Sequence, residues 1–81
     1  MYVVIHTTGT RLDAHTYVSV SDSYEEAKRD MYEDVEATLG EGNHDEDGFR
    51  TDCFYRYDGT VHESIEYAGD PIHEWHLYGT F

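Results

Sequence analysis

Residues 23–40, SYEEAKRDMYEDVEATLG, carry the clearest structural signal in this chain of 81 residues. Ser23 is followed three positions later by Glu26, a capping-box pattern that marks the start of a helix. Gly40 is the residue type that most often follows a helix end. Apolar side chains recur between these two signals at helical spacing, at Tyr24, Ala27, Met31, Val35 and Leu39. The segment therefore predicts a helix over residues 24–39 whose apolar stripe packs on a sheet.

The sequence on either side of this helix is typical of strands. Residues 1–8 are rich in β-branched side chains and residues 16–20 alternate, so the stretch between them predicts a hairpin loop. Three further strand-like runs follow the helix, at residues 49–57, 60–67 and 72–81. The predicted order is β-β-α-β-β-β. We expect an α+β fold and one domain over residues 1–81, with a single antiparallel sheet of about five strands and one helix packed on one face.

The turn between the third and fourth predicted strands decides which side chains share a face. Asp-Gly at residues 58–59 is typical of a two-residue turn, but that register would mix apolar and polar side chains. A three-residue loop that includes the preceding tyrosine, with a bulge at Gly59, sets Thr51 opposite Ile65 and makes one face apolar. It also sets Arg50 against Glu66 on the other face. We expect that face to be wet and to carry Arg50, Asp52, Arg56, His62, Glu66, Glu74 and His76. In the last strand, the apolar face is expected to hold Trp75, Leu77 and Phe81.

Charge excludes several classes of function. Asp and Glu number 18 against five Lys and Arg, which gives a formal net charge of −13. So few cations cannot hold a phosphate backbone, and the acidic surface would be repelled by anionic lipid. The lone Cys53 excludes an internal disulfide, and the apolar run at residues 2–5 is too short for a secretion signal or a membrane span. We expect a soluble protein of the cytoplasm.

No side-chain pattern completes a catalytic or metal-binding motif. His73 and His76 lie three apart, which on a strand directs them to opposite faces. The loop that begins at Asp45 lacks the spacing of a calcium loop, and Cys53 suits a small core position. Glu63 falls on the predicted apolar face, either at the end of the sheet or paired with an arginine, and a glutamate base there is the enzymatic alternative. We expect no cofactor, no metal ion and no catalysis.

The pattern of carboxylates is the remaining signal. With 100° of rotation per residue, some acidic residues of the predicted helix face solvent and others lie beside the apolar stripe. The loop after the helix holds further acidic residues. The candidate partner-binding residues are Glu25, Glu26, Glu33 and Glu36 on the solvent side, Asp30 and Asp34 beside the stripe, and Glu41, Asp45, Glu46 and Asp47 in the loop. Carboxylates four residues apart on a helix lie ~6 Å apart along its axis, comparable to the spacing of phosphates on a nucleic-acid strand.

In its small size, its charge and the acidic helix and loop over residues 25–47, the chain resembles the small phage-encoded DNA mimics and anti-CRISPR inhibitors. That resemblance implies a stoichiometric inhibitor whose carboxylates pair with Lys and Arg in the nucleic-acid channel of a bacterial defence complex. It implies no catalysis and action in the cytoplasm of the host cell. Two alternatives stay open: a small acidic domain adapted to high salt, and an acidic protein-interaction module with another role.

Overall fold

A computed structural model describes residues 1–9, 13–59 and 62–79. It confirms the predicted α+β fold, with one five-stranded antiparallel sheet in the order β2-β1-β5-β4-β3 and one helix. The elements are β1 (Tyr2–Gly9), β2 (Ala14–Ser21), α1 (Tyr24–Leu39), β3 (Phe54–Asp58), β4 (His62–Tyr67) and β5 (Ile72–Gly79). Part of the predicted first loop, the start of the predicted fourth strand and Phe81 lie outside the described residues.

Helix α1 has the bounds and caps that its sequence predicts. The Ser23 side chain accepts a hydrogen bond from the backbone N–H of Glu26 at 3.2 Å. At the other end, Gly40 adopts a φ of 76°, which favours glycine, and its N–H donates to the carbonyl of Glu36 at 2.9 Å. Among the described residues, no helix has both the length and the apolar character that crossing a membrane requires.

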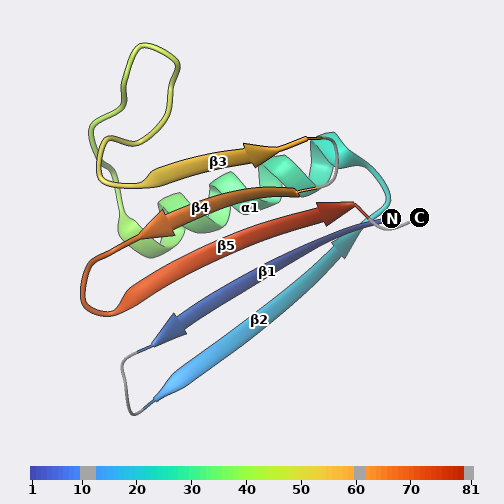
Figure 1. The fold of residues 1–81 in the computed structure, drawn as a ribbon, viewed down its shortest axis with the longest axis horizontal. Helices are drawn as coiled ribbons and strands as arrows, with labels where there is room; N and C mark the ends of the chain where they lie inside the picture. Colours follow the sequence, from blue (N-terminus) through green and yellow to red (C-terminus); the bar gives the residue numbers. More distant parts are fainter. Residues whose placement is uncertain (10–12, 60–61, 80–81) are drawn as a thin grey trace.

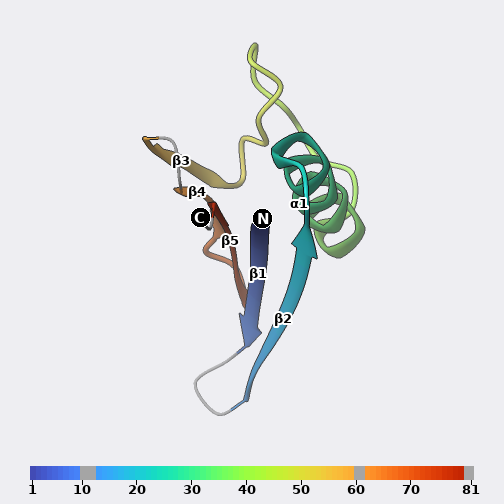
Figure 2. The ribbon, with the colours of Figure 1, turned by 90° about the vertical axis from the view of Figure 1, so that its right-hand side faces the viewer.

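The helix covers one face of the sheet and leaves the other face open (Figures 1 and 2). Its buried side chains, Ala27, Met31 and Val35, are the middle of the predicted stripe. They meet Trp75 and Leu77, which share a face of β5 as predicted and are 0 % and 2 % exposed. Val4 of β1 and Ile65 of β4 complete the buried cluster. The core is small, and aromatic side chains packed around it extend it: Tyr2, Tyr24, Tyr32, Tyr55 and Tyr67.

The predicted register of β3 against β4 is wrong. Tyr55 lies opposite Ile65 and Asp58 opposite His62. The observed register differs from the predicted one by four residues. A slip by an even number leaves every side chain on its face, which is why Tyr55 and Ile65 still point toward the helix. Glu66 lies opposite Phe54 and Glu74, and it does not meet Arg50.

The predicted third strand also begins too early. Strand β3 starts at Phe54, and the segment before it leaves the sheet and passes beside the end of the helix. Arg50 is 9 % exposed and bonds to the helix end, while Asp52 is its partner; neither lies on the open face of the sheet. A buried guanidinium requires carboxylates and carbonyls around it, and the helix end supplies both. This requirement outweighed the strand-like alternation of residues 49–53.

Glu63 is a carboxylate in the core side of the sheet and is 3 % exposed. Pairing with an arginine is one of the two expected arrangements, and among the described residues no arginine contacts Glu63. Its Oε1 accepts hydrogen bonds from the hydroxyls of Tyr24 and Tyr55, the latter at 3.1 Å, and lies 3.7 Å from Nζ of Lys28. Burial and these hydrogen bonds raise the pKa of Tyr24, and they raise that of Tyr55 to about 12. Both phenols therefore stay protonated and keep donating to Glu63 at neutral pH.

The indole of Trp75 fixes the helix to the centre of the sheet, because its Nε1–H donates to Oδ2 of Asp34 at 2.8 Å. We predict that Trp75→Phe lowers the free energy of unfolding by about 2–3 kcal/mol, from the lost hydrogen bond to a charged group and a small cavity. Urea denaturation measures it. Tyr57→Phe, which removes a hydroxyl from an exposed ring, is the control and should change stability by less than about 0.5 kcal/mol. Equal effects of the two substitutions would contradict this anchoring role.

Candidate acidic binding surface

The outward side of α1 carries carboxylates without internal partners. Glu25, Glu26 and Glu33 are exposed because they lie opposite the buried residues Ala27 and Met31 on the helix. Among the described residues, none of these three side chains makes a hydrogen bond or an ion pair. Their charges are therefore fully available to solvent or to a partner.

The loop over residues 40–49 begins at the end of the helix and projects past the β3 edge of the sheet (Figures 1 and 2). Asp45 organises it: one carboxylate oxygen accepts from the backbone N–H groups of Asp47 at 2.9 Å and Phe49 at 3.0 Å. Glu46 and Asp47 therefore lie at an ordered tip, exposed to solvent. Asp45 combines a structural role with its charge.

Arg50 joins the loop to the helix. Its guanidinium donates to Oε2 of Glu36 at 3.1 Å and to the carbonyl of Gly40 at 2.6 Å, so it also satisfies the helix C-terminus. Nε and Nη2 donate to the two carboxylate oxygens of Asp52, both at 2.9 Å. These bonds raise the pKa of Arg50 and lower that of Asp52. A Cβ at Gly42 would lie 2.5 Å from Nη2, so a larger residue there would displace the guanidinium from these hydrogen bonds.

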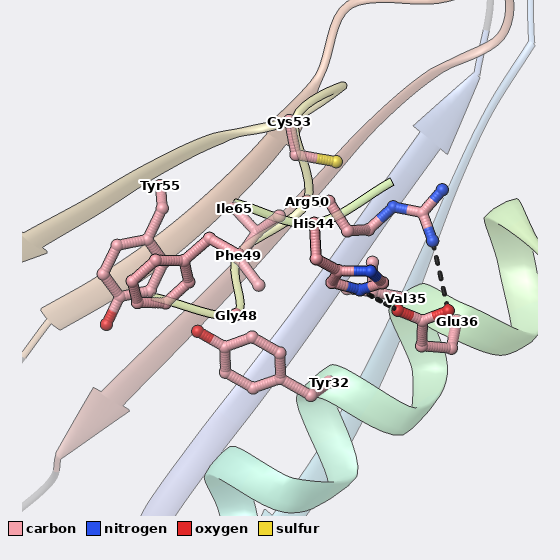
Figure 3. A pocket seen from close by; sticks show the side chains of 10 residues that line it. All are labelled: Tyr32, Val35, Glu36, His44, Gly48, Phe49, Arg50, Cys53, Tyr55 and Ile65. Carbon is pink, nitrogen blue, oxygen red and sulfur yellow. Dashed lines mark hydrogen bonds and ion pairs between the residues drawn. The ribbon is translucent and has the colours of Figure 1, made fainter. Parts of the chain in front are cut away.

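Glu36 is held from two sides, because His44 reaches its other oxygen at 3.0 Å (Figure 3). The contacts of Glu36 with His44 and Arg50 bring the helix end and the acidic loop together. These contacts hold the start of the acidic loop against the C-terminal end of α1. We call the six unpartnered carboxylates of the helix and the loop the acidic ridge: Glu25, Glu26, Glu33, Glu41, Glu46 and Asp47.

Asp34 and Asp30 differ from the acidic ridge because they point toward the β2 side of the helix. Asp34 accepts from Trp75 and lies 2.9 Å from Nδ1 of His6. Asp30 has only a long contact, 3.8 Å, to Arg29. Of the ten predicted partner-binding residues, Asp34, Glu36 and Asp45 thus hold internal partners that the fold uses.

The sequence did not reveal that the side chains of Asp34, His6 and His73 are linked in a row by hydrogen bonds. His6 and His73 are 8 % exposed, and Nε2 of His6 lies 3.0 Å from Nδ1 of His73. With Asp34 ionised, Nδ1 of His6 donates to it, so Nε2 accepts the proton of His73. No local pattern links residues so far apart in the sequence. Only the alternation that directs His6 and His73 inward could have marked them.

The pocket between the loop and the core is too small for a ligand. It is lined by Tyr32, Phe49, Tyr55 and seven other residues, and its volume of about 20 Å³ has room for one water molecule (Figure 3). The rings of Phe49 and Tyr55 stack at 4.4 Å between centroids and close it. Cys53 also lines it, and burial raises the pKa of its thiol to about 11. Over residues 1–9, 13–59 and 62–79, no three His, Cys, Asp or Glu side chains converge as metal ligands.

Comparison with protein-family models, with curated proteins and with solved structures found no match to this chain.

The burial of His6 makes stability depend on pH. Desolvation lowers the pKa of His6 below its ordinary value of 6.5, against the raising effect of Asp34. Because the pKa of His6 is lower in the folded state, the unfolded chain binds a proton at this residue more readily than the folded one. The stability that neutral His6 contributes is therefore complete above pH 6.5 and is lost as the pH falls toward its folded-state pKa. We predict that NMR titration gives His6 a pKa under 6.5 and that the unfolding free energy falls from pH 7 to pH 5.5. A His6 pKa above 6.5 would contradict this.

Proposed function

We propose that this protein is a non-catalytic inhibitor that docks its acidic ridge on a cationic nucleic-acid-binding channel of a bacterial defence complex. It would act as a DNA mimic of the anti-CRISPR kind, in the cytoplasm of the host cell. The observation that carries the proposal is the acidic ridge itself: six exposed carboxylates, three on the outward side of α1 and three in the following loop, have no internal partner among the described residues.

The layout of the acidic ridge suits a channel that holds a nucleic-acid strand. Glu26 and Glu33 lie about 10 Å apart along the helix axis. The loop that follows the helix, which holds Glu46 and Asp47, projects to the side of the helix past the β3 edge of the sheet (Figure 1). Exposed carboxylates spaced along a helix can meet Lys and Arg side chains that otherwise contact successive phosphates. It would also speed the encounter with such a target at low salt.

The internal contacts divide the carboxylates in a way that favours a role in binding. Asp34, Glu36 and Glu63 each have donors positioned by the fold. The acidic ridge has none among the described residues, and a surface selected for stability would intersperse cations among such groups. Adaptation to high salt is the competing explanation, and it predicts carboxylates that can be exchanged without loss of a partner.

A capture experiment with two matched charge-reversal variants tests the proposal. The ridge variant carries Glu33→Lys and Glu46→Lys; the control carries Asp58→Lys and Glu74→Lys on the open side of the sheet, with the same change in net charge. Immobilised wild-type protein is exposed to a lysate of the source cells at low salt. We expect it to retain proteins that bind nucleic acid, and added duplex DNA should displace them.

The affinity of each captured protein is then measured for both variants. We expect the ridge variant to bind about tenfold more weakly or worse, and the control to bind within about twofold of the wild type, because only the former places repulsive charges in the contact. Circular dichroism confirms that both fold. Equal binding by both variants, or direct binding of duplex DNA by the protein itself, would contradict the proposal.

A further inference from the structure

Strand β2 is an edge strand that lacks the usual protection against pairing. It pairs with β1 over all eight residues in an unbroken register, and no strand of the described part of the chain lies on its other side. Its sequence, AHTYVSVS, holds no Asp, Glu, Lys, Arg or Pro, although 28 % of the whole chain is charged. Natural edge strands are normally blunted by charge, proline or a bulge. Alternate residues of β2 therefore present free N–H and C=O groups to any extended chain.

The opposite edge is built differently. Strand β3 has five residues and carries Arg56 and Asp58 on the open face. Charged side chains on a short edge strand discourage the addition of another strand. The absence of such residues from β2 is thus a local feature of this edge of the sheet.

The two faces of β2 offer different side-chain environments to an added strand. On the open face, Val18 and Val20 are 62 % and 57 % exposed and lie opposite Ile5 and Val3 of β1. These four aliphatic residues form an apolar surface that ends at the edge of the sheet. An added strand would extend it with apolar side chains.

The face toward the helix is acidic. A groove of about 320 Å³ runs between β2 and α1 and is lined by Tyr17 and Ser19 of the strand and by Asp30 and Asp34 of the helix. The Asp30 and Asp34 side chains are 42 % and 48 % exposed. Two carboxylates above a free strand edge favour Lys or Arg on this side of an added strand.

We propose that β2 is a docking edge for an extended segment of a partner protein whose side chains alternate between basic and apolar. The backbone would pair with β2, the basic side chains would reach Asp30 and Asp34, and the apolar ones would join Val18 and Val20. This surface is separate from the acidic ridge and does not depend on the proposed function.

A second copy of the chain suits this edge less well. Antiparallel pairing of two β2 strands about a two-fold axis would place both helices on the same face of the joined sheet. Asp30 and Asp34 of the two copies would then face one another, and β2 has no Lys or Arg to place between them. Charge complementarity thus selects a basic partner strand.

The test uses a capped synthetic octapeptide, Lys-Val-Arg-Thr-Lys-Val-Arg-Thr, titrated into the isotopically labelled protein at about 0.15 M salt, where exposed charges are largely screened. The control peptide has the same composition in blocks, Lys-Lys-Arg-Arg-Val-Val-Thr-Thr. We expect the alternating peptide to shift the amide resonances of β2 and slow their hydrogen exchange. The block peptide should bind about fivefold more weakly or worse, since it cannot match both faces.

Substitutions distinguish peptide binding at the β2 edge from general charge attraction. Val18→Lys places a charge on the edge strand and should weaken the alternating peptide about tenfold, whereas the matched Phe54→Lys on β3 should leave its affinity within about twofold. Asp30→Asn should weaken it about threefold, the scale of one exposed ion pair. Glu33→Lys with Glu46→Lys, which tests the acidic ridge, should leave peptide binding within about twofold.

Three results would overturn the proposal. The first is equal binding of the two peptides, which would reveal only charge attraction. The second is a set of amide shifts that leaves β2 unaffected. The third is protection of the β2 amides that rises with protein concentration in the absence of peptide, which would make a second copy the occupant.

Discussion

A shortage of cations is the constraint on which the rest of this structure depends. The chain has 18 carboxylate side chains and five Lys and Arg, so most acids that approach the core must be satisfied by neutral donors. Asp34 accepts from an indole and an imidazole, and Glu63 from two tyrosine hydroxyls with Lys28 nearby. A buried carboxylate without such donors would destabilise the fold by several kcal/mol. The high tyrosine content thus serves hydrogen bonding as well as apolar burial.

The same constraint shapes the surface. Arg50 is buried in the joint between helix and loop, where it serves Glu36, Asp52 and a helix carbonyl at once. Lys28 is drawn toward Glu63. Few cations remain for the outer side of α1, and the acidic ridge stays unpaired. The mutual repulsion of these carboxylates opposes folding, so stability alone gives no reason for them to persist.

The sequence predicted the parts of the fold that local signals control. The capping residues and apolar stripe defined α1, and alternation placed Trp75 and Leu77 inside. The predicted register of β3 was wrong because Arg50 bonds to the end of the helix and lies outside the strand. This is a tertiary contact that no strand pattern encodes. The ten candidate acids were predicted as one class. Whether one of these carboxylates stabilises the fold depends on hydrogen-bond donors, several of them distant in sequence, which only the structure reveals.

The central claim is that the acidic ridge contributes charge and no stabilising contact. The most direct measurement is the unfolding free energy, at low and high salt, of the wild type and of a variant carrying Glu33→Gln, Glu41→Gln and Glu46→Gln. The account predicts a variant more stable by about 0.5–1.5 kcal/mol at low salt, with a difference that shrinks as salt screens the repulsion. A variant less stable than the wild type at low salt would contradict it, because those carboxylates would then be part of what holds the protein together.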